Sequence, residues 1–249
     1  MGSLDGRVSI VTGGARGIGR AYCLGMAAEG SAVVVADLVD GQPVVVEIEA
    51  GGGKAIAVHA DVSDEASKQA MARATLEQFG RIDVLVNNAA YFKQVKRGPF
   101  DQLDVEEWDK AFQVNVRGAW LCCRAVYPYM KEQRYGKIIN ISSNTVWKGV
   151  PGFLHYVTSK AALTGLTRSL AREVGDDNIA VNTVAPDFIP DEDMLKTRGS
   201  HSDEVIAQRA FKRMQVPEDM IGIIVFLAGP GSDFITGQSF LVNGGAHFQ

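Results

Sequence analysis

Short apolar runs recur along the chain and are separated by stretches in which apolar residues return at helical spacing. The runs are rich in Val and Ile, and several are apolar at nearly every position, which is typical of parallel strands buried on both faces. Gly, Asp and Asn residues bound many of them, as expected where strands meet turns. These runs predict strands at residues 8–11, 32–36, 54–59, 83–86, 137–141, 179–184 and 239–242.

Helices are predicted in the stretches between the strands, at residues 20–29, 64–79, 105–131, 156–174 and 218–228. Asp64 is a favourable N-cap for the second of these helices, and Gly80 is a favourable stop. Strands that alternate with helices predict an α/β fold in which helices cover both faces of a parallel sheet. Because no repeat, linker or change in composition marks a boundary, we predict a single doubly wound domain over residues 1–249.

Residues 186–216 do not fit this alternation. The stretch is irregular and mixes acidic and basic residues with large apolar ones. It follows the sixth predicted strand, and ligands bind at the carboxyl ends of the strands in such sheets. We therefore interpret it as a mobile substrate lid. The alternative is a solvated excursion that contains its own short helix.

Composition limits the function classes. Of 249 residues, 46% are hydrophobic and 22% are charged, which is ordinary for a globular protein with a full core. The net charge of −4 offers no basic surface for nucleic acid. Its three cysteines lack the spacing of a zinc or redox site, and its four histidines lack that of metal ligands, so we predict no metal.

The expected location is cytoplasmic. The N-terminus lacks the apolar core of a signal peptide, and the longest apolar run, residues 221–228, is too short to cross a bilayer. The cysteines are interpreted as free thiols in a reducing compartment. We expect a soluble protein.

A glycine-rich turn follows the first strand, with the sequence TGGARGIG at residues 12–19. The order is typical of a dinucleotide-binding unit: a strand, the glycine turn, a helix, a second strand and then the acidic residue Asp37. The glycines allow backbone N–H groups to approach a pyrophosphate at a helix N-terminus. Asp37 would accept hydrogen bonds from ribose hydroxyls and repel the 2′-phosphate of NADP, so NAD is the predicted cofactor. Arg16 weakly favours NADP instead, because an arginine could bind that phosphate.

Tyr156 and Lys160 are four residues apart on a predicted helix, and both side chains therefore emerge from one face. A fixed cation beside a phenol favours the phenolate and lowers its pKa, which would allow proton exchange near neutral pH. Taken alone, the pair is better explained as one turn of a solvated helix, and only the rest of the chain can favour the chemical interpretation.

Taken together, these motifs resemble the short-chain dehydrogenase/reductase family. The resemblance rests on the turn at 12–19, Asp61, the NNAA sequence at 87–90, Asn115, Ser143 and the YVTSK sequence at 156–160, and it covers essentially the whole chain. It implies a Rossmann-like sheet of seven parallel strands with helices on both faces. It also implies NAD(P)-dependent interconversion of an alcohol and a ketone, usually by a homotetramer.

The resemblance also implies roles for single residues. Tyr156 would be the general acid/base, Lys160 would tune it and bind the nicotinamide ribose, Ser143 would orient the substrate oxygen, and Asn115 would anchor a proton-relay water. Asp61 and Val62 would contact adenine, and Asn88 would stabilise the fourth strand near the ribose. The cofactor-binding set we predict is Gly13, Arg16, Gly17, Ile18, Gly19, Asp37, Asp61, Val62, Asn88, Ala89, Tyr156, Lys160, Pro186 and Ile189.

The chain departs from the family pattern after the sixth strand. Pro186 is followed by Asp187, where the family usually has Gly, and no threonine occupies the position that would contact the nicotinamide amide. Backbone groups, Ile189 first among them, are therefore expected to hold that amide. Ala90 also stands where the family often has Gly, a mild change next to Tyr91 and Phe92.

Substrate contacts are predicted near the reacting residues. The predicted set is Ser143, Thr145, Trp147, Phe153 and Tyr156, with Asn144, Leu154, His155, Tyr91 and Phe92 nearby. Aromatic side chains there favour an apolar, cyclic or aromatic alcohol or ketone as the small-molecule substrate. Simple packing beneath the lid explains the same residues almost as well.

Three functions remain open. The first is an NAD-dependent secondary-alcohol dehydrogenase. The second is a 3-oxoacyl-thioester reductase, against which Asp37 argues because such enzymes usually use NADPH. The third is a dinucleotide-binding regulatory protein without turnover, which would be expected to lose Tyr156 or Lys160. For the tetramer, the helices that contain Trp120 and that follow Tyr156 are the expected contacts, with Ala162, Leu166 and Leu170 supplying apolar surface.

Overall fold

Within residues 2–190 and 199–248, the part of the chain that the computed structural model describes, seven strands form one parallel sheet. Their order is β3-β2-β1-β4-β5-β6-β7, with the chain reversing its direction of travel across the sheet between β3 and β4. The predicted α/β doubly wound sheet is therefore confirmed. The strands are β1 (Val8–Thr12), β2 (Ala32–Asp37), β3 (Lys54–His59), β4 (Val84–Asn87), β5 (Gly136–Ile141), β6 (Ile179–Pro186) and β7 (Ser239–Val242).

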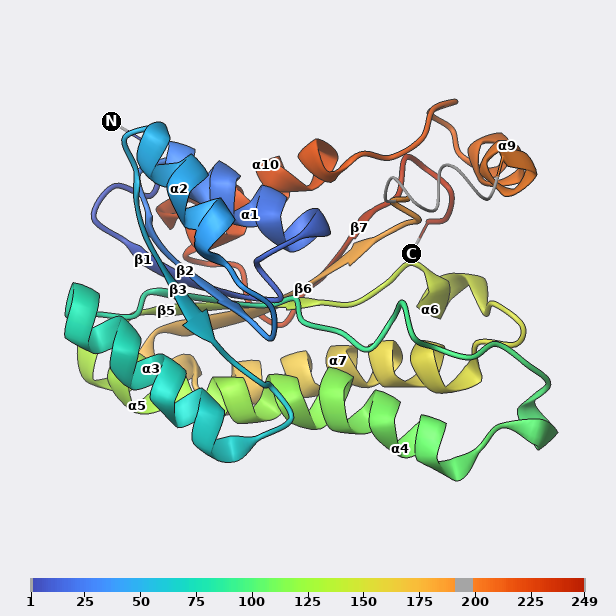
Figure 1. Ribbon diagram of the computed structural model, residues 1–249, viewed down its shortest axis with the longest axis horizontal. Coiled ribbons are helices and arrows are strands. Elements are labelled where there is room, and N and C mark those ends of the chain that lie inside the picture. The colour runs from blue at the N-terminus through green and yellow to red at the C-terminus, as the bar shows by residue number, and fades with distance from the viewer. Residues whose placement is uncertain (1, 191–198, 249) are drawn as a thin grey trace.

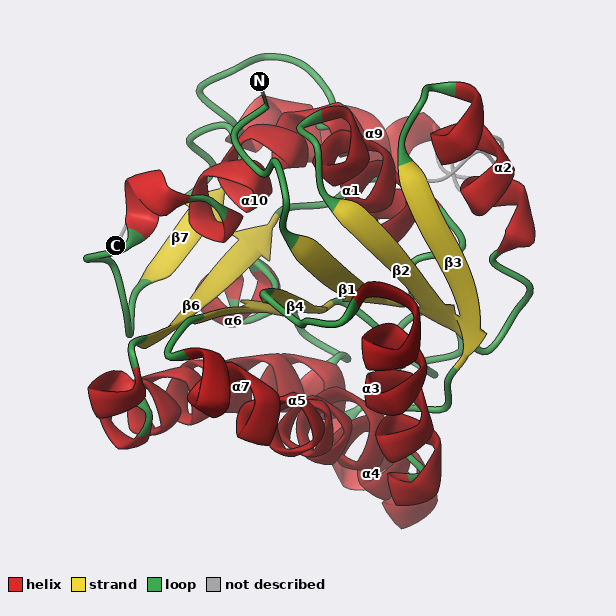
Figure 2. Cartoon of the chain, turned by 90° about the vertical axis from the view of Figure 1, so that its left-hand side faces the viewer, coloured by secondary structure: helices red, strands yellow, loops and turns green. Residues whose placement is uncertain are grey.

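Every residue of β1, β4, β5 and β6 is buried, as their largely apolar sequences predict. Helices cover both faces of the sheet (Figures 1 and 2). One layer contains α1 (Gly17–Ala28), α2 (Gln42–Ala50) and α10 (Ile221–Ala228). The other contains α3 (Glu65–Phe79), α4 (Val105–Phe112), α5 (Ala119–Gln133) and α7 (Leu154–Glu173).

Two apolar clusters fill the space between these layers and the sheet. On the α1 side, Tyr22, Met26 and Ile224 pack against the strands, and on the α5 side Met71, Val126 and Met130 do so. The core thus lies on both faces, and the carboxyl ends of the strands remain free to form a site.

The ends of α3 follow the local signals. The Asp64 side chain accepts a hydrogen bond from the backbone N–H of Ser67 at 2.7 Å, and Gly80 adopts a left-handed φ of 74° at the other end. The predicted N-cap and stop are therefore confirmed.

Four helical segments differ from expectation. The helix predicted at 105–131 is divided into α4, a π-helical turn at Gln113–Gly118 and α5. The helix predicted at 218–228 begins with a 3-10 turn at Pro217–Met220, before α10. No prediction covered α2 or the short α6 (Thr145–Lys148).

The remaining helical elements are short or lie near the predicted lid. Helix α9 (Gly199–Gln208) falls within the lid stretch, of which residues 191–198 lie outside the described part of the chain. Further 3-10 turns occur at Phe100–Gln102, Gly175–Asp177 and Pro230–Ser232. Over the residues described, no helix combines the length and the apolar character that a membrane span needs.

Candidate active site

A cavity of about 1070 Å³ opens at the carboxyl ends of the strands. Its wall combines the glycine turn after β1, the ends of β2 and β4, the β5–α6 and β6–α9 connections, and the first turns of α7. Most of the predicted residues line it: Gly13, Arg16, Gly17, Ile18, Gly19, Asp37, Asp61, Val62, Asn88, Ala89, Ser143, Thr145, Phe153, Tyr156, Lys160, Pro186 and Ile189. The fold therefore brings residues that are far apart in sequence to one cavity.

The glycine turn has the form needed to hold a pyrophosphate. A Cβ at Gly17, where φ is +57°, would point into open space, whereas one at Gly19 would collide with the Gly13 carbonyl oxygen. Helix α1 begins at Gly17, and no side chain caps its first N–H groups. Uncapped N–H groups at a helix N-terminus bind anions, so these residues fit the phosphates of a dinucleotide.

Asp37 and Asn88 brace this end of the cavity. The Asp37 carboxylate accepts the N–H groups of Ala15 at 3.0 Å and Val39 at 3.2 Å, so its orientation is fixed beside the glycine turn. The Asn88 amide donates to the carbonyl oxygens of Thr12 at 2.9 Å and Gly13 at 3.0 Å. Asn88 thereby ties the end of β4 to the turn after β1.

Tyr156 lies in an aromatic stack. Its ring is 4.5 Å from that of Phe153, nearly parallel to it, and 5.3 Å from that of Phe92. Burial raises the pKa of the Tyr156 phenol to about 12, and a hydrogen bond with the Ser143 hydroxyl acts in the opposite direction. Ser143 also accepts hydrogen bonds from the Thr145 N–H and hydroxyl, which hold its oxygen in place.

Lys160 is buried beneath Tyr156, one helical turn further along α7. Burial lowers the pKa of its ammonium group to about 7, and Nζ donates to the Ile141 carbonyl oxygen at 2.8 Å. Nζ is 5.9 Å from the centre of the Tyr156 ring. The pKa of Tyr156 is therefore raised rather than lowered, because burial of the phenol outweighs the hydrogen bond with Ser143.

Asn115 lies behind this pair, in the π-helical turn, and does not line the cavity. Its amide donates to the Ser159 hydroxyl at 2.9 Å, and its carbonyl oxygen accepts the Tyr91 N–H at 2.7 Å. Asn115 thus connects the segment after β4 to the helix that carries Tyr156. The π-helical geometry shifts the helix register at this point, as is frequent at functional sites.

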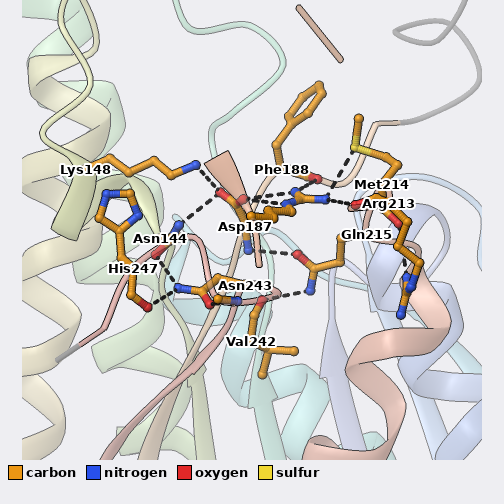
Figure 3. A network of polar contacts seen from close by, with 12 residues as sticks. Asn144, Lys148, Asp187, Phe188, Arg213, Met214, Gln215, Val242, Asn243 and His247 are labelled. Carbon is orange, nitrogen blue, oxygen red and sulfur yellow. Dashed lines mark hydrogen bonds and ion pairs between the residues drawn. The ribbon is translucent and has the colours of Figure 1, made fainter. Parts of the chain in front are cut away.

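Asp187 lines the cavity and is the centre of a polar network, with Lys148 and Asn144 on one side and Gln215 on the other (Figure 3). Its carboxylate accepts Lys148 Nζ at 2.8 Å, Asn144 Nδ2 at 3.1 Å and Arg209 Nε at 3.0 Å. Burial alone would raise the pKa of Asp187, but the hydrogen bonds from Lys148 and Asn144 and the two positive charges hold it below its ordinary value. This network occupies the place where the family pattern has Gly.

Other predicted contacts lie outside the cavity wall. Tyr91 and Phe92 line the cavity, but Asn144, Trp147, Leu154 and His155 do not. Asn144 instead donates its backbone N–H to the Pro186 carbonyl oxygen at 2.8 Å.

Sequence reasoning missed several wall residues, namely Arg97, Lys148, Phe188, Glu204, Val205, Gln208 and His247. Three of these belong to α9 in the predicted lid stretch. The signal for Lys148 was available, because an acid in place of glycine at position 187 needs a cation nearby once it is buried. Nothing local in the sequence pointed to His247, which reaches the cavity from the C-terminal segment.

Comparison with known proteins finds relatives over almost the full chain. A family model described as enoyl-(acyl carrier protein) reductase matches residues 13–247. The 3-oxoacyl-[acyl-carrier-protein] reductase of a Synechocystis strain is 38% identical over 249 residues, which cover 98% of each chain. The (2S)-[(R)-hydroxy(phenyl)methyl]succinyl-CoA dehydrogenase subunit of Thauera aromatica is 36% identical and covers 97% of each chain.

Two solved structures resemble the fold closely. A protein from Sinorhizobium meliloti assigned as a short-chain alcohol dehydrogenase superposes with a TM-score of 0.91 at 31% identity, covering 98% of this chain and 97% of that one. A Beutenbergia cavernae protein assigned as an NAD(P)-dependent gluconate 5-dehydrogenase, with NADP bound at low occupancy, has a TM-score of 0.89 at 35% identity, covering 97% and 96%.

Proposed function

The chain belongs to the short-chain dehydrogenase/reductase family of NAD(P)-dependent oxidoreductases, and we propose that it uses NAD to interconvert a secondary alcohol and a ketone. The observation that carries the proposal is the placement of Tyr156, Ser143 and Lys160 in the same cavity as the uncapped N-terminus of α1. A bound NAD would supply the hydride acceptor there, and the chain has only to position carbon and oxygen and to move one proton.

Tyr156 is the general acid/base of the proposed reaction. As a phenol with a raised pKa it is protonated at neutral pH, so it is ready to donate its proton to a ketone oxygen. Ser143, held by Thr145, donates a second hydrogen bond to the same oxygen and fixes its direction. In the oxidation direction Tyr156 takes the hydroxyl proton, a step that requires the phenolate and is favoured by high pH.

Lys160 and Asn115 support that proton transfer. Lys160 is positioned by the Ile141 carbonyl oxygen, and its remaining N–H groups are available for the nicotinamide ribose. Asn115 holds the Tyr91 backbone and Ser159, and we place the route from Lys160 to solvent along this segment.

NAD is the proposed cofactor because Asp37 ends β2 beside the glycine turn. Its carboxylate is fixed by two backbone N–H groups, and the residue after it, Leu38, is exposed and uncharged. A 2′-phosphate at this place would meet a negative charge, whereas ribose hydroxyls would find an acceptor.

An aromatic or cyclic apolar substrate fits the walls around Tyr156. Phe92 and Phe153 flank the phenol, and Phe188 also lines the cavity. Flat rings pack well against such walls in offset or edge-to-face arrangements. Helix α9 supplies Glu204, Val205 and Gln208 to the same cavity, which supports a lid role for the 186–216 stretch.

A second candidate is reduction of a 3-oxoacyl thioester. It is favoured by the curated relatives, several of which are 3-oxoacyl-[acyl-carrier-protein] reductases at 36–38% identity. Asp37 and the aromatic walls support the first candidate over it. A third possibility, dinucleotide binding without turnover, is disfavoured because Tyr156, Lys160, Ser143 and Asn115 are all in place.

The test is a substrate panel with purified protein. Secondary alcohols with aromatic, cyclic and aliphatic groups are assayed with NAD and with NADP by the absorbance of the reduced cofactor, and a 3-oxoacyl thioester is assayed with NADH and NADPH. We expect the highest kcat/KM for an aromatic or cyclic alcohol with NAD. The thioester with NADPH giving the highest value would reject the proposal in favour of the second candidate.

A further inference from the structure

Two cations share one buried carboxylate at the substrate end of the cavity. The side chains of Arg209 and Asp187 are only 1% and 3% exposed, so their ion pair is almost fully removed from water. Arg209 Nη2 lies 2.9 Å from Asp187 Oδ2, and Lys148 Nζ lies 2.8 Å from Oδ1. One negative charge thus faces two positive charges.

Arg209 is the cation that neutralises Asp187. Its Nε and Nη2 both contact Oδ2, while its remaining hydrogen bonds go to the carbonyl oxygens of Phe188 at 2.9 Å and Arg213 at 3.0 Å and to the sulfur of Met214 at 3.6 Å. All of its nitrogens are therefore committed to the protein, and none is free for a ligand.

Lys148 keeps N–H donors and a positive charge that Asp187 does not fully satisfy. An ammonium group has three N–H donors, and Asp187 Oδ1 is the one acceptor recorded for it in residues 2–190 and 199–248. Its side chain is 14% exposed and lines the cavity. A partly buried charge without a full counter-charge is costly, and an anion entering from the cavity would relieve that cost.

The position of Lys148 relative to the reacting oxygen is fixed. Lys148 ends α6, five residues after Ser143, and Asn144 between them is bonded to both Pro186 and Asp187. Asn243 donates to the Asn144 side chain at 3.2 Å, which adds the C-terminal segment to the same framework. A ligand group on Lys148 would therefore stand at a defined distance from the oxygen held by Ser143.

Three other charged residues of the cavity wall are not part of this carboxylate site. Lys93, Arg97 and Glu204 line the cavity, and each has interactions of its own within the protein. The single positive charge in excess at Asp187 matches a monoanion better than a phosphate, which carries nearly two negative charges at neutral pH.

We propose that Lys148, anchored on Asp187, binds a carboxylate group of the substrate, so that the enzyme selects an aromatic or cyclic alcohol or ketone that is also an acid. The inference rests on the proposed function for the identity of the reacting group. The carboxylate subsite itself rests on Lys148, Asp187 and Arg209 alone. It makes Lys148 a specificity-determining residue.

The experiment compares two ligands that differ in charge but hardly in shape. Binding of 4-acetylbenzoate and 4-acetylbenzamide to the full chain is measured by calorimetry with saturating NAD, since a ketone and the oxidised cofactor cannot react with each other. The wild-type protein is expected to bind the carboxylate about tenfold more tightly than the amide. Lys148→Met should bring the two dissociation constants to within about twofold of each other, and Lys148→Arg should restore most of the preference.

Controls distinguish a specific loss of carboxylate binding from a general loss of structure. Lys54→Met removes an exposed lysine at the start of β3, away from the cavity, and should keep the wild-type preference. Thermal unfolding of each variant reports whether Asp187 and Arg209 still hold the fold, and Lys148→Gln serves if Lys148→Met is unstable. No preference in the wild-type protein, including no binding of the carboxylate, or the same preference after Lys148→Met, would overturn the proposal.

Tyr156→Phe separates this proposal from the proposed function. It should keep the preference for the carboxylate, because it leaves Lys148 unchanged. If wild-type protein binds 4-acetylbenzoate selectively through Lys148 but no secondary alcohol is oxidised, the subsite stands and the proposed function fails. If secondary alcohols are oxidised but substitution of Lys148 does not change the preference for the carboxylate, the proposed function stands and the subsite fails.

Discussion

At the scale of single residues, burial shifts the pKa values of two neighbouring side chains in opposite directions. The pKa of Tyr156 is raised to about 12 and that of Lys160 is lowered to about 7. In both cases removal from water disfavours the charged form. The sequence predicted a permanent cation beside a phenol, whereas the structure places a protonated phenol beside an amine that titrates near neutral pH. At neutral pH the phenol therefore holds a proton that it can donate to a ketone oxygen, whereas alcohol oxidation is favoured by high pH.

The two partners of Tyr156 should differ in their effect on the cofactor. Lys160→Ala should weaken NAD affinity by about tenfold, because it removes a buried donor to the nicotinamide ribose, and should also lower kcat. Ser143→Ala should lower kcat but leave NAD affinity unchanged, because Ser143 faces the substrate oxygen. Fluorescence titration with NAD measures both, and equal affinity in wild type and both variants would reject the double role of Lys160.

The lowered pKa of Lys160 has a consequence for stability. Between pH 7 and 10.5 the unfolded chain binds a proton that the folded protein does not, so stability due to this residue rises with pH across that interval. Below pH 7 both states are protonated and the cost of burying the ammonium is constant.

We therefore expect the free energy of unfolding of wild type, relative to Lys160→Met, to rise between pH 7 and 10 by up to about 1.4 kcal/mol per pH unit. Urea denaturation at several pH values measures this difference. A difference that stays constant or falls over the interval would show that the Lys160 pKa is not lowered.

At the scale of elements, strands were predicted better than helices. Buried parallel strands carry an apolar signal at every position, and each of the seven is found within two residues of its predicted bounds. Helix α2 was missed because its Val44-Val45-Val46 run favours a strand locally, and packing against α1 overrides that preference. The π-helical turn was missed because no local pattern marks a shift of one residue in hydrogen bonding.

The residues of the candidate site also fall into a group that the sequence predicts and a group that it does not. Motif residues such as Gly13, Asp37 and Tyr156 were found, because their spacing on a strand–turn–helix unit carries the signal. Lys148, Arg209 and His247 were not, because Asp187 and the cavity bring them together from separate segments only after folding.

The N-cap of α3 offers a test at this scale. Asp64→Ala removes the hydrogen bond to the Ser67 N–H and should lower the free energy of unfolding by about 1 kcal/mol. Asp104 is the matched control, since it precedes α4 but makes no capping hydrogen bond, and Asp104→Ala should cost clearly less. Urea denaturation compares the two, and an equal loss in both variants would contradict the capping role.

At the scale of the whole molecule, the helical layers leave large apolar side chains in water. Trp120 on α5 is 44% exposed, and Phe234 before β7 is fully exposed. Exposed apolar surface of this kind favours association between copies. It supports the homotetramer proposed from the family, with α5 and α7 as contact helices.

Sedimentation tests the assembly. We expect a tetramer at micromolar concentration, and Trp120→Arg should shift the distribution toward smaller species by placing a charge in an apolar contact. Lys54→Ala, an exposed change at the start of β3 and outside both contact helices, is a suitable comparison. A monomer at all concentrations would reject the tetramer.

The central claim is that Tyr156 exchanges the proton in an NAD-dependent alcohol–ketone reaction. The most direct measurement compares wild type with Tyr156→Phe, using the best alcohol from the panel and following the absorbance of NADH, with NAD affinity measured in parallel. The account predicts that kcat falls by about 100-fold or more while NAD affinity changes by less than about threefold. Turnover and NAD binding that both survive at wild-type levels would contradict it.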